Sequence, residues 1–197
     1  MTSAYTAFPN DGVRILPRFL RTVSDYNGEV REENQVEVKE VISQQTARTM
    51  VQLLRGVVEF GTAQQAKILK QPVAGKTGTT NDFTDAWFVG FSPSLVAGVW
   101  VGFDDQRSLG DREAGATAAL PIWVSYMKEA LPLVPSASFV IPDDIVFAKI
   151  DPESGLLAPP GDEDAAVEVF VKGNEPTQYL TPQAKPAQFF QLDEMAN

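Results

Sequence analysis

Three short extended segments between residues 73 and 103 constrain the fold of this chain more than any other feature. They run from about Val73 to Thr79, from Ala86 to Phe91 and from Leu95 to Phe103. The last two are separated only by the turn Ser92-Pro93-Ser94. Valine and aromatic side chains between turn residues are typical of strands, so the segments predict an antiparallel meander.

Helical patterns lie on both sides of this meander. Ser43 is a predicted N-cap, and apolar residues at helical spacing then continue until Gly61 ends the run. A second helix is predicted over about residues 117–131, with Trp123, Tyr126 and Met127 on one face. A third apolar stripe is already running at residue 1 and stops before Gly12, so we expect the chain to begin inside a helix, as a fragment would.

The remaining segments predict smaller β structures. Residues 14–31 read as a strand, a turn at Asn27-Gly28 and a return strand, followed by a charged connector. Residues 143–160 predict a hairpin around Asp151–Gly155, and "AAVEVFVKG" predicts one more strand. We therefore expect residues 1–134 to form the main domain, 135–176 a small β-rich extension and 177–197 a flexible tail.

Composition excludes several classes of function. With 197 residues and 44% hydrophobic content, the chain has enough material for one domain with a core plus a small appendage. A net charge of −10 argues against a nucleic-acid partner. Without Cys or His, acid–base chemistry would have to use Lys, Tyr, Asp or Glu. No segment is long and apolar enough to span a membrane, so we expect the chain by itself to be soluble.

Acidic clusters at residues 104–105, 143–144 and 162–164 lack the spacing of a calcium loop, and we assign them to solvated surface. No metal and no cofactor is predicted.

The stretch Gly75-Lys76-Thr77 matches the end of a nucleotide phosphate loop. That loop requires glycine where this chain has Lys70, and it requires a helix directly after the Lys-Thr pair. A glycine, polar residues and an aromatic strand follow instead, so we reject the phosphate loop.

A second interpretation places Lys76-Thr77-Gly78-Thr79 on an edge strand beside a serine nucleophile, as in serine acyl-transferases that react with penicillin. A lysine would attract a substrate carboxylate, hydroxyls would hydrogen-bond it, and glycine would let the ligand approach the backbone. A backbone N–H on such an edge can also stabilise a tetrahedral oxyanion. The simpler alternative is a surface strand that happens to carry a lysine.

Longer stretches favour the acyl-transferase interpretation. The segments "MTSAYTAFPNDGVRILPRFL", "VVEFGTAQQAK", "PVAGKTGTTNDFTDAWFVGFSPSLVAGVWVGFDD" and "AALPIWVSYM" resemble, in this order, the C-terminal half of the transpeptidase domain of class A, bifunctional penicillin-binding proteins. The resemblance extends more weakly through residue 176. It implies an α+β fold, with an antiparallel sheet flanked by helices as part of a serine transpeptidase/β-lactamase-like fold, and a small β-rich C-terminal appendage.

The resemblance also implies site roles. Thr77 and Thr79, with Gly78 between them, look like the residues that hold the carboxylate of a β-lactam or a D-Ala-D-Ala stem peptide. Lys76 looks like the electrostatic anchor, and the Thr79 backbone N–H looks like an oxyanion-hole donor. The residues Asp85-Ala86-Trp87 match the next strand of the family and are expected to pack.

The family places S-x-x-K, with the nucleophile, and S-x-N before K-T-G-T, and residues 1–75 contain neither. One S-x-x-K occurs later, at Ser125 to Lys128. Helical geometry directs both side chains away from the face of Trp123 and Met127, and the order is wrong, so we interpret this match as coincidence.

The favoured hypothesis is a fragment of a peptidoglycan-crosslinking transpeptidase from which the glycosyltransferase domain and the nucleophile half are absent, and which is inactive alone. Its partners would be a stem peptide, a β-lactam or the missing half of the domain, and the parent would work outside the cytoplasmic membrane. The alternatives are a non-catalytic module that binds a peptide or protein through an exposed sheet edge, and a nicked enzyme that reassembles.

Overall fold

The computed structural model of the chain describes residues 1–105, 107–110, 112–141, 143–162 and 164–181. They form two compact units, residues 1–143 and a second unit that begins at Asp144. The tail expected from residue 177 lies outside the described residues from 182 onward, and Glu163 of the third acidic cluster lies outside them as well.

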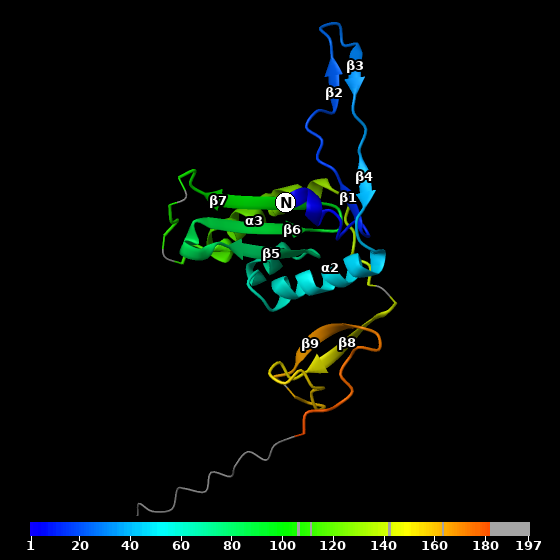
Figure 1. The fold of residues 1–197 in the computed structure, drawn as a ribbon, viewed down its shortest axis with the longest axis vertical. Coiled ribbons are helices and arrows are strands. Elements are labelled where there is room, and N and C mark those ends of the chain that lie inside the picture. The colour runs from blue at the N-terminus through cyan, green and yellow to red at the C-terminus, as the bar shows by residue number, and fades with distance from the viewer. Residues whose placement is uncertain (106, 111, 142, 163, 182–197) are drawn as a thin grey trace, which may run out of the picture. The chain divides into compact units, whose positions relative to one another are not determined.

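A three-stranded antiparallel sheet organises the first unit (Figure 1). Strand β5 (Ala74–Thr79) pairs with β6 (Asp85–Phe91), and β6 pairs with β7 (Val96–Gly102). The turn from β6 to β7 is closed by the Ser92 N–H, which donates to the Leu95 carbonyl at 2.8 Å. The predicted meander is confirmed.

Helix α2 (Gln44–Glu59) precedes this sheet and contacts β5 (Figure 1). Its N-terminus is capped by the Ser43 side chain, which accepts a hydrogen bond from the Thr46 N–H as predicted. A 3₁₀-helix, η1 (Gln64–Leu69), follows α2 and leads into β5. Val51 and Leu54 of α2 pack with Ala74 and Phe91 on one face of the sheet.

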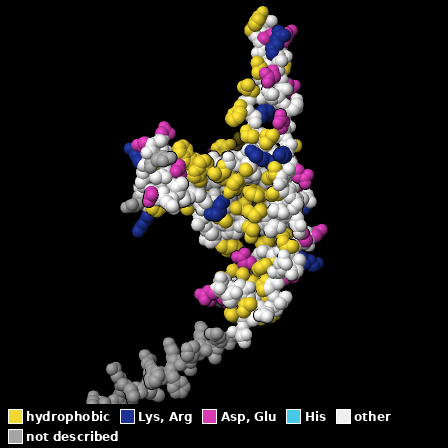
Figure 2. Space-filling view, in the orientation of Figure 1, with side chains coloured by type: hydrophobic (Ala, Val, Ile, Leu, Met, Phe, Trp, Pro, Cys, Tyr) yellow, Lys and Arg dark blue, Asp and Glu magenta, His cyan; other side chains and the backbone are white. Residues whose placement is uncertain are grey.

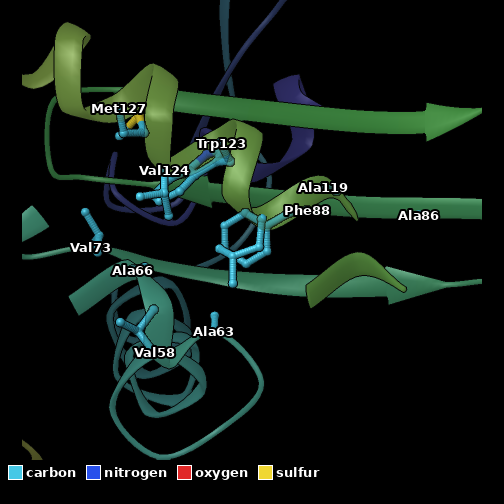
Figure 3. Close-up of a cluster of buried hydrophobic side chains, with 11 residues drawn as sticks. Val58, Ala63, Ala66, Val73, Ala86, Phe88, Ala119, Trp123, Val124 and Met127 are labelled. Carbon is cyan, nitrogen blue, oxygen red and sulfur yellow. The ribbon is translucent and has the colours of Figure 1, made fainter. Parts of the chain in front are cut away.

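Helix α3 (Leu120–Ala130) packs on the other face of the sheet, after a π-helical turn, η3 (Gly115–Ala119), and before a 3₁₀ turn, η4 (Leu131–Leu133). Figure 3 shows Trp123, Val124 and Met127 of this helix above Phe88 of β6. The Trp123 and Phe88 rings meet edge to face with centroids 4.9 Å apart, and the Trp123 indole N–H donates to the Ala97 carbonyl. This cluster is the main core of the unit.

The sequence prediction for α3 was wrong at one residue. Trp123 and Met127 are buried as expected, but Tyr126 is exposed. Tyr126 lies three positions after Trp123, at the margin of a buried stripe that the next residue, Met127, already fills.

The N-terminal segment forms less helix than predicted. Helix α1 (Thr2–Tyr5) is a single turn, and residues 6–12 continue as turns. Of the predicted apolar stripe, Met1 and Ala4 are exposed, and only Tyr5 and Phe8 pack as expected. Phe8 meets Tyr5 edge to face and lies 6.2 Å from the Phe91 ring. Gly12 ends the segment with φ +92°, a conformation that favours glycine. A Cβ atom there would also clash with the Ile42 backbone.

Two small antiparallel pairs follow α1. Strand β1 (Val13–Ile15) pairs with β4 (Val38–Glu40), and β2 (Thr22–Ser24) pairs with β3 (Val30–Glu33). The predicted turn at Asn27-Gly28 is present, with Gly28 at φ +85°. The predicted return strand is β3, which begins at Val30. The expected charged connector, residues 32–41, instead contributes β4, because Val38 pairs with Ile15 of β1.

The second unit contains a two-stranded antiparallel sheet of β8 (Ile145–Ile150) and β9 (Ala166–Val171). The predicted turn after β8 is present, and the Asp151 carboxylate accepts hydrogen bonds from the Ser154 N–H and hydroxyl at 2.7 Å each. These bonds lower the pKa of Asp151. The return segment makes only isolated bridges, from Leu157 to Ile150 and to Tyr179, and β9 supplies the ladder. The α+β class predicted for the chain is confirmed.

Candidate functional site

The candidate site is the outer edge of β5, which carries Lys76, Thr77, Gly78 and Thr79. In the described part of the chain, β5 pairs with β6 alone, so its second edge has no strand partner. The first two residues of the strand are buried, whereas Lys76 and Thr79 are exposed and Thr77 and Gly78 are half-buried. The K-T-G-T half of β5 is therefore the open half.

The hydrogen-bond register determines which backbone groups point to this open edge. Thr80 lies one step beyond the Thr79–Ala86 pair, and its N–H donates to the Asp85 carbonyl at 3.1 Å. Directly opposed residues of an antiparallel pair alternate between bonded and non-bonded positions. Gly78 therefore directs its backbone groups to β6, and Thr77 and Thr79 direct theirs away from it.

A side-chain contact agrees with this register. The Lys76 ammonium donates to the Thr77 carbonyl at 3.0 Å, which requires that carbonyl to face the open edge. The same ammonium lies 3.5 Å from the Thr77 hydroxyl. A positive charge, an outward carbonyl, an outward N–H and a hydroxyl thus meet at Thr77.

Side-chain alternation places the two threonine hydroxyls on one face of β5 and Lys76 on the other. The threonine face is the one against which α3 packs, because Phe88 of the Thr77–Phe88 pair contacts Trp123. Lys76 reaches the edge from the opposite face. The edge is therefore approached by polar groups from both faces of the sheet.

Each threonine hydroxyl has a partner from a distant part of the chain. The Thr62 hydroxyl, just beyond α2, lies 2.9 Å from the Thr77 hydroxyl. The Gly115 N–H, at the start of η3, donates to the Thr79 hydroxyl at 2.9 Å. These two contacts were not predicted, because neither Thr62 nor Gly115 belongs to the K-T-G-T motif. The only sequence signals were a Gly-Thr pair after a helix and the small-residue run "AGATAA".

Gly115 lies against the backbone of β5 and β6. A Cβ atom at this position would be 2.7 Å from the Gly78 carbonyl oxygen, 3.0 Å from the Gly78 nitrogen, and also too close to the Trp87 carbonyl oxygen. Glycine is therefore required for η3 to approach Thr79 closely.

The turn after Thr79 is organised by hydroxyl and carboxylate groups. The Thr80 hydroxyl accepts from the Asp85 N–H at 2.9 Å and lies 2.8 Å from the Thr84 hydroxyl. Asp85 in turn accepts a hydrogen bond from the Trp100 indole N–H at 2.8 Å. The packing role predicted for Asp85 to Trp87 agrees with these contacts, since Ala86 is buried and Trp87 lies 6.2 Å from the Trp100 ring.

Hydrophobic side chains gather over the sheet in the view of Figure 2. Trp87 and Trp100 lie on the face that carries Lys76, and Trp100 is 44% exposed. This face of the sheet is partly covered by Val51 and Leu54 of α2 and by the N-terminal segment, through Phe8 on Phe91 and Thr2 at Gly98.

The S-x-x-K match at Ser125 to Lys128 lies outside the candidate site. Ser125 and Lys128 are both exposed on α3, on the side away from its buried residues. Lys128 lines a separate hollow of about 430 Å³ with Leu69, Pro93 and Pro132, and no residue of β5 lines that hollow.

Neither a metal centre nor a membrane span is found in the described residues. No group of three or more Asp or Glu side chains there is close enough to hold a metal ion. Across the same residues, every helix is too short or too polar to cross a bilayer.

Comparisons with known proteins agree with the fold. Residues 1–119 match the family described as the penicillin binding protein transpeptidase domain, and residues 141–183 match the family described as the C-terminal domain of penicillin-binding protein 1A. Penicillin-binding protein 1A of Aquifex aeolicus is 47% identical over 176 residues, covering 89% of this chain and 24% of the relative. The chain thus spans about a quarter of that relative's length.

Solved structures of penicillin-binding proteins are also similar to this chain. The crystal structure of penicillin-binding protein 1A from Haemophilus influenzae is similar with a TM-score of 0.76 and 30% identity, covering 91% of this chain and 32% of that one. Penicillin binding protein 3 of Mycobacterium tuberculosis, solved in complex with ampicillin, is similar with a TM-score of 0.53 and 26% identity, covering 71% and 37%.

Proposed function

Because the chain belongs to the penicillin-binding protein transpeptidase family, we propose that the open edge of β5 holds the carboxylate end of a peptidoglycan stem peptide or of a β-lactam. The observation that carries this proposal is the register of β5. It places the backbone groups of Thr77 and Thr79 on the free edge, beside both hydroxyls and the Lys76 ammonium.

Each residue of the edge has a separate role in this proposal. Lys76 attracts the carboxylate through its charge, and the Thr77 and Thr79 hydroxyls donate hydrogen bonds to it. Gly78 has no side chain, so the ligand can lie close to the strand. The outward N–H of Thr79 is available to stabilise an oxyanion that develops on the carbonyl under attack.

The reaction that such an edge serves is serine acyl-transfer. A serine hydroxyl attacks the penultimate carbonyl of the stem peptide, the terminal D-alanine leaves with the serine's proton, and an amine of another strand then displaces the serine. In the printed sequence no S-x-x-K precedes K-T-G-T. We therefore propose that these 197 residues supply the ligand-holding edge, and that they bind penicillin without being acylated by it.

The domain organisation and location follow from the same premise. We propose that residues 1–134 contribute to the transpeptidase domain, that residues 135–176 form a small β-rich extension and that residues 177–197 are a tail. The parent protein would act outside the cytoplasmic membrane, on the cell wall.

Two measurements on the chain test the proposal. Incubation with benzylpenicillin followed by intact-mass determination is expected to show no covalent adduct. Titration followed by NMR is expected to show weak, saturable shifts of the Thr77 and Thr79 amide signals, which Thr77→Ala and Thr79→Ala abolish. An adduct would overturn the assignment of the nucleophile to residues outside this sequence. Absence of saturable binding would overturn the carboxylate site.

A second candidate function is recognition of an extended peptide by strand addition, which the unpaired edge of β5 favours. Backbone pairing would not need a carboxylate on the ligand. Binding of a peptide amide as tightly as the corresponding free acid would therefore favour this function over the first.

A further inference from the structure

We propose that Thr62 is a positioning residue for the carboxylate site: its hydroxyl donates to the Thr77 hydroxyl and thereby turns the single proton of Thr77 toward the bound anion. The inference rests on the proposed function of the β5 edge. The motif K-T-G-T does not include Thr62, which lies 15 positions upstream of Thr77.

The two hydroxyl oxygens lie 2.9 Å apart, and either one can be the donor when no ligand is bound. A hydroxyl has one proton and two lone pairs. If Thr77 gives its proton to Thr62, it has none left for a carboxylate. If Thr62 is the donor, the Thr77 oxygen accepts the proton of Thr62, and the Thr77 proton stays available to the carboxylate at the strand edge.

Lys76 is compatible with the second arrangement, and the bound anion selects it. The Lys76 ammonium lies 3.5 Å from the Thr77 hydroxyl and can act only as a donor, so it approaches the oxygen of Thr77 and not its proton. A carboxylate at the edge would likewise accept only. When the anion is bound, Thr62 and Lys76 donate to Thr77, and Thr77 donates to the anion. Hydrogen bonds that all donate in the same direction strengthen one another.

The local fold holds Thr62 in place. Its neighbour Ala63 is buried in the main core, and the Ala63 N–H donates to the Val57 carbonyl at 3.0 Å. On its other side, a Cβ atom on Gly61 would lie 2.9 Å from Val57 Cα, so this chain path needs glycine there. The Thr62 side chain itself is exposed, so replacing it leaves the core unchanged.

A matching arrangement exists at the second hydroxyl. The Gly115 N–H donates to the Thr79 hydroxyl, so Thr79 also accepts from the protein and keeps its proton for the ligand. Thr62 therefore does for Thr77 with a side chain what Gly115 does for Thr79 with its backbone. Both hydroxyls of the motif become donors toward the same edge.

The test uses Thr62→Val, which keeps the side-chain shape and removes the hydroxyl, with Thr62→Ala as a second variant lacking it. Affinity is measured on the full chain by NMR titration with benzylpenicillin and with its methyl ester, which lacks the carboxylate charge. Both variants are expected to weaken benzylpenicillin binding roughly three- to tenfold, the effect of one hydrogen bond in a charged site. Binding of the methyl ester is expected to stay unchanged, and Thr62→Ser is expected to restore the affinity.

Two controls separate the possible failures. Thr49→Val on α2, where the hydroxyl bonds the Gln45 carbonyl, is expected to leave both affinities unchanged. If Thr77→Val has no effect on benzylpenicillin binding, the proposed function fails. If Thr77→Val weakens binding but Thr62→Val and Thr62→Ala do not, the role of Thr62 alone is overturned. Equal losses for acid and ester, or no recovery with Thr62→Ser, would assign Thr62 a merely structural role and also overturn the inference.

Discussion

Replacing Gly115 by alanine is expected to destabilise the first unit and to disturb the candidate site together. The new Cβ atom would lie 2.7 Å from the Gly78 carbonyl oxygen and would also crowd the Trp87 carbonyl oxygen. Ordinary contacts of a carbon atom are about 3.5 Å, so η3 must move away from the strands by roughly 0.8 Å or more. Both obstructing atoms belong to sheet backbone, which cannot rotate aside.

The cost of such overpacking is about 2–3 kcal/mol, which corresponds to a decrease of roughly 5–10 °C in the melting temperature of a unit of this size. The movement also lengthens the bond from the Gly115 N–H to the Thr79 hydroxyl, now 2.9 Å. Benzylpenicillin binding is therefore expected to weaken as well.

Urea unfolding followed by tryptophan fluorescence measures the effect. All three tryptophans of the sequence lie in the first unit, so the signal reports on that unit alone. Gly56→Ala is the matched control: it adds a Cβ atom inside α2 with nothing within 4 Å, and it should stabilise by about 0.5–1 kcal/mol. If Gly115→Ala is as stable as the wild type and leaves the Thr79 amide signal unchanged, the close approach of η3 to β5 is refuted.

Three further outcomes are expected. Trp123→Ala should lower the free energy of unfolding by about 3–5 kcal/mol in urea titrations followed by circular dichroism, because it empties the centre of the core. The hydrogen bond from Arg48 lowers the pKa of Asp11 in the folded chain. The contact therefore stabilises the fold in full above the pKa of an unfolded aspartate, about 3.9, and this stabilisation is lost as the pH falls through the lower folded pKa. In the Asp11→Asn variant, the free energy of unfolding should fall less steeply as the pH drops below about 4. The difference from the wild type should be less than about 1 kcal/mol, because Asp11 is 46% exposed. Ser125→Ala should change stability by less than about 0.5 kcal/mol and should leave the mass spectrum after benzylpenicillin treatment unchanged.

The parts of the fold that the sequence predicted correctly are those that depend on local patterns. The meander follows from valines and aromatics between turn residues, and α2 begins directly after Ser43 because a serine there can satisfy one of the first free N–H groups. The first helix was overextended, since Met1, Ala4, Tyr5 and Phe8 make an apolar stripe whether the chain between them is a helix or a series of turns.

Pairings between distant segments were not predictable in the same way. Residues 32–41 read as a charged connector, yet they contribute β4, which returns to pair with β1. That pairing depends on where α1 and α2 place the two ends of the segment between them, and residue spacing does not specify those positions.

At the candidate site, the motif residues could be identified from sequence, but their orientation could not. The register that turns Thr77 and Thr79 outward depends on β6, and the partners Thr62 and Gly115 come from 15 positions before Thr77 and 36 after Thr79. Contacts across such separations are set by the packing of α2 and η3 on the sheet.

The open half of β5 also has a consequence for the solution behaviour of the chain. Free backbone groups on a strand edge can pair with the same edge of another molecule, and such pairing leads to aggregation. Lys76 is exposed in the middle of this edge, so two copies that approached edge to edge would bring two ammonium groups together and desolvate both. The residue proposed to attract a ligand would thus also protect the chain from self-association, and a Lys76→Ala variant is expected to gain a tendency to aggregate as it loses affinity for carboxylates.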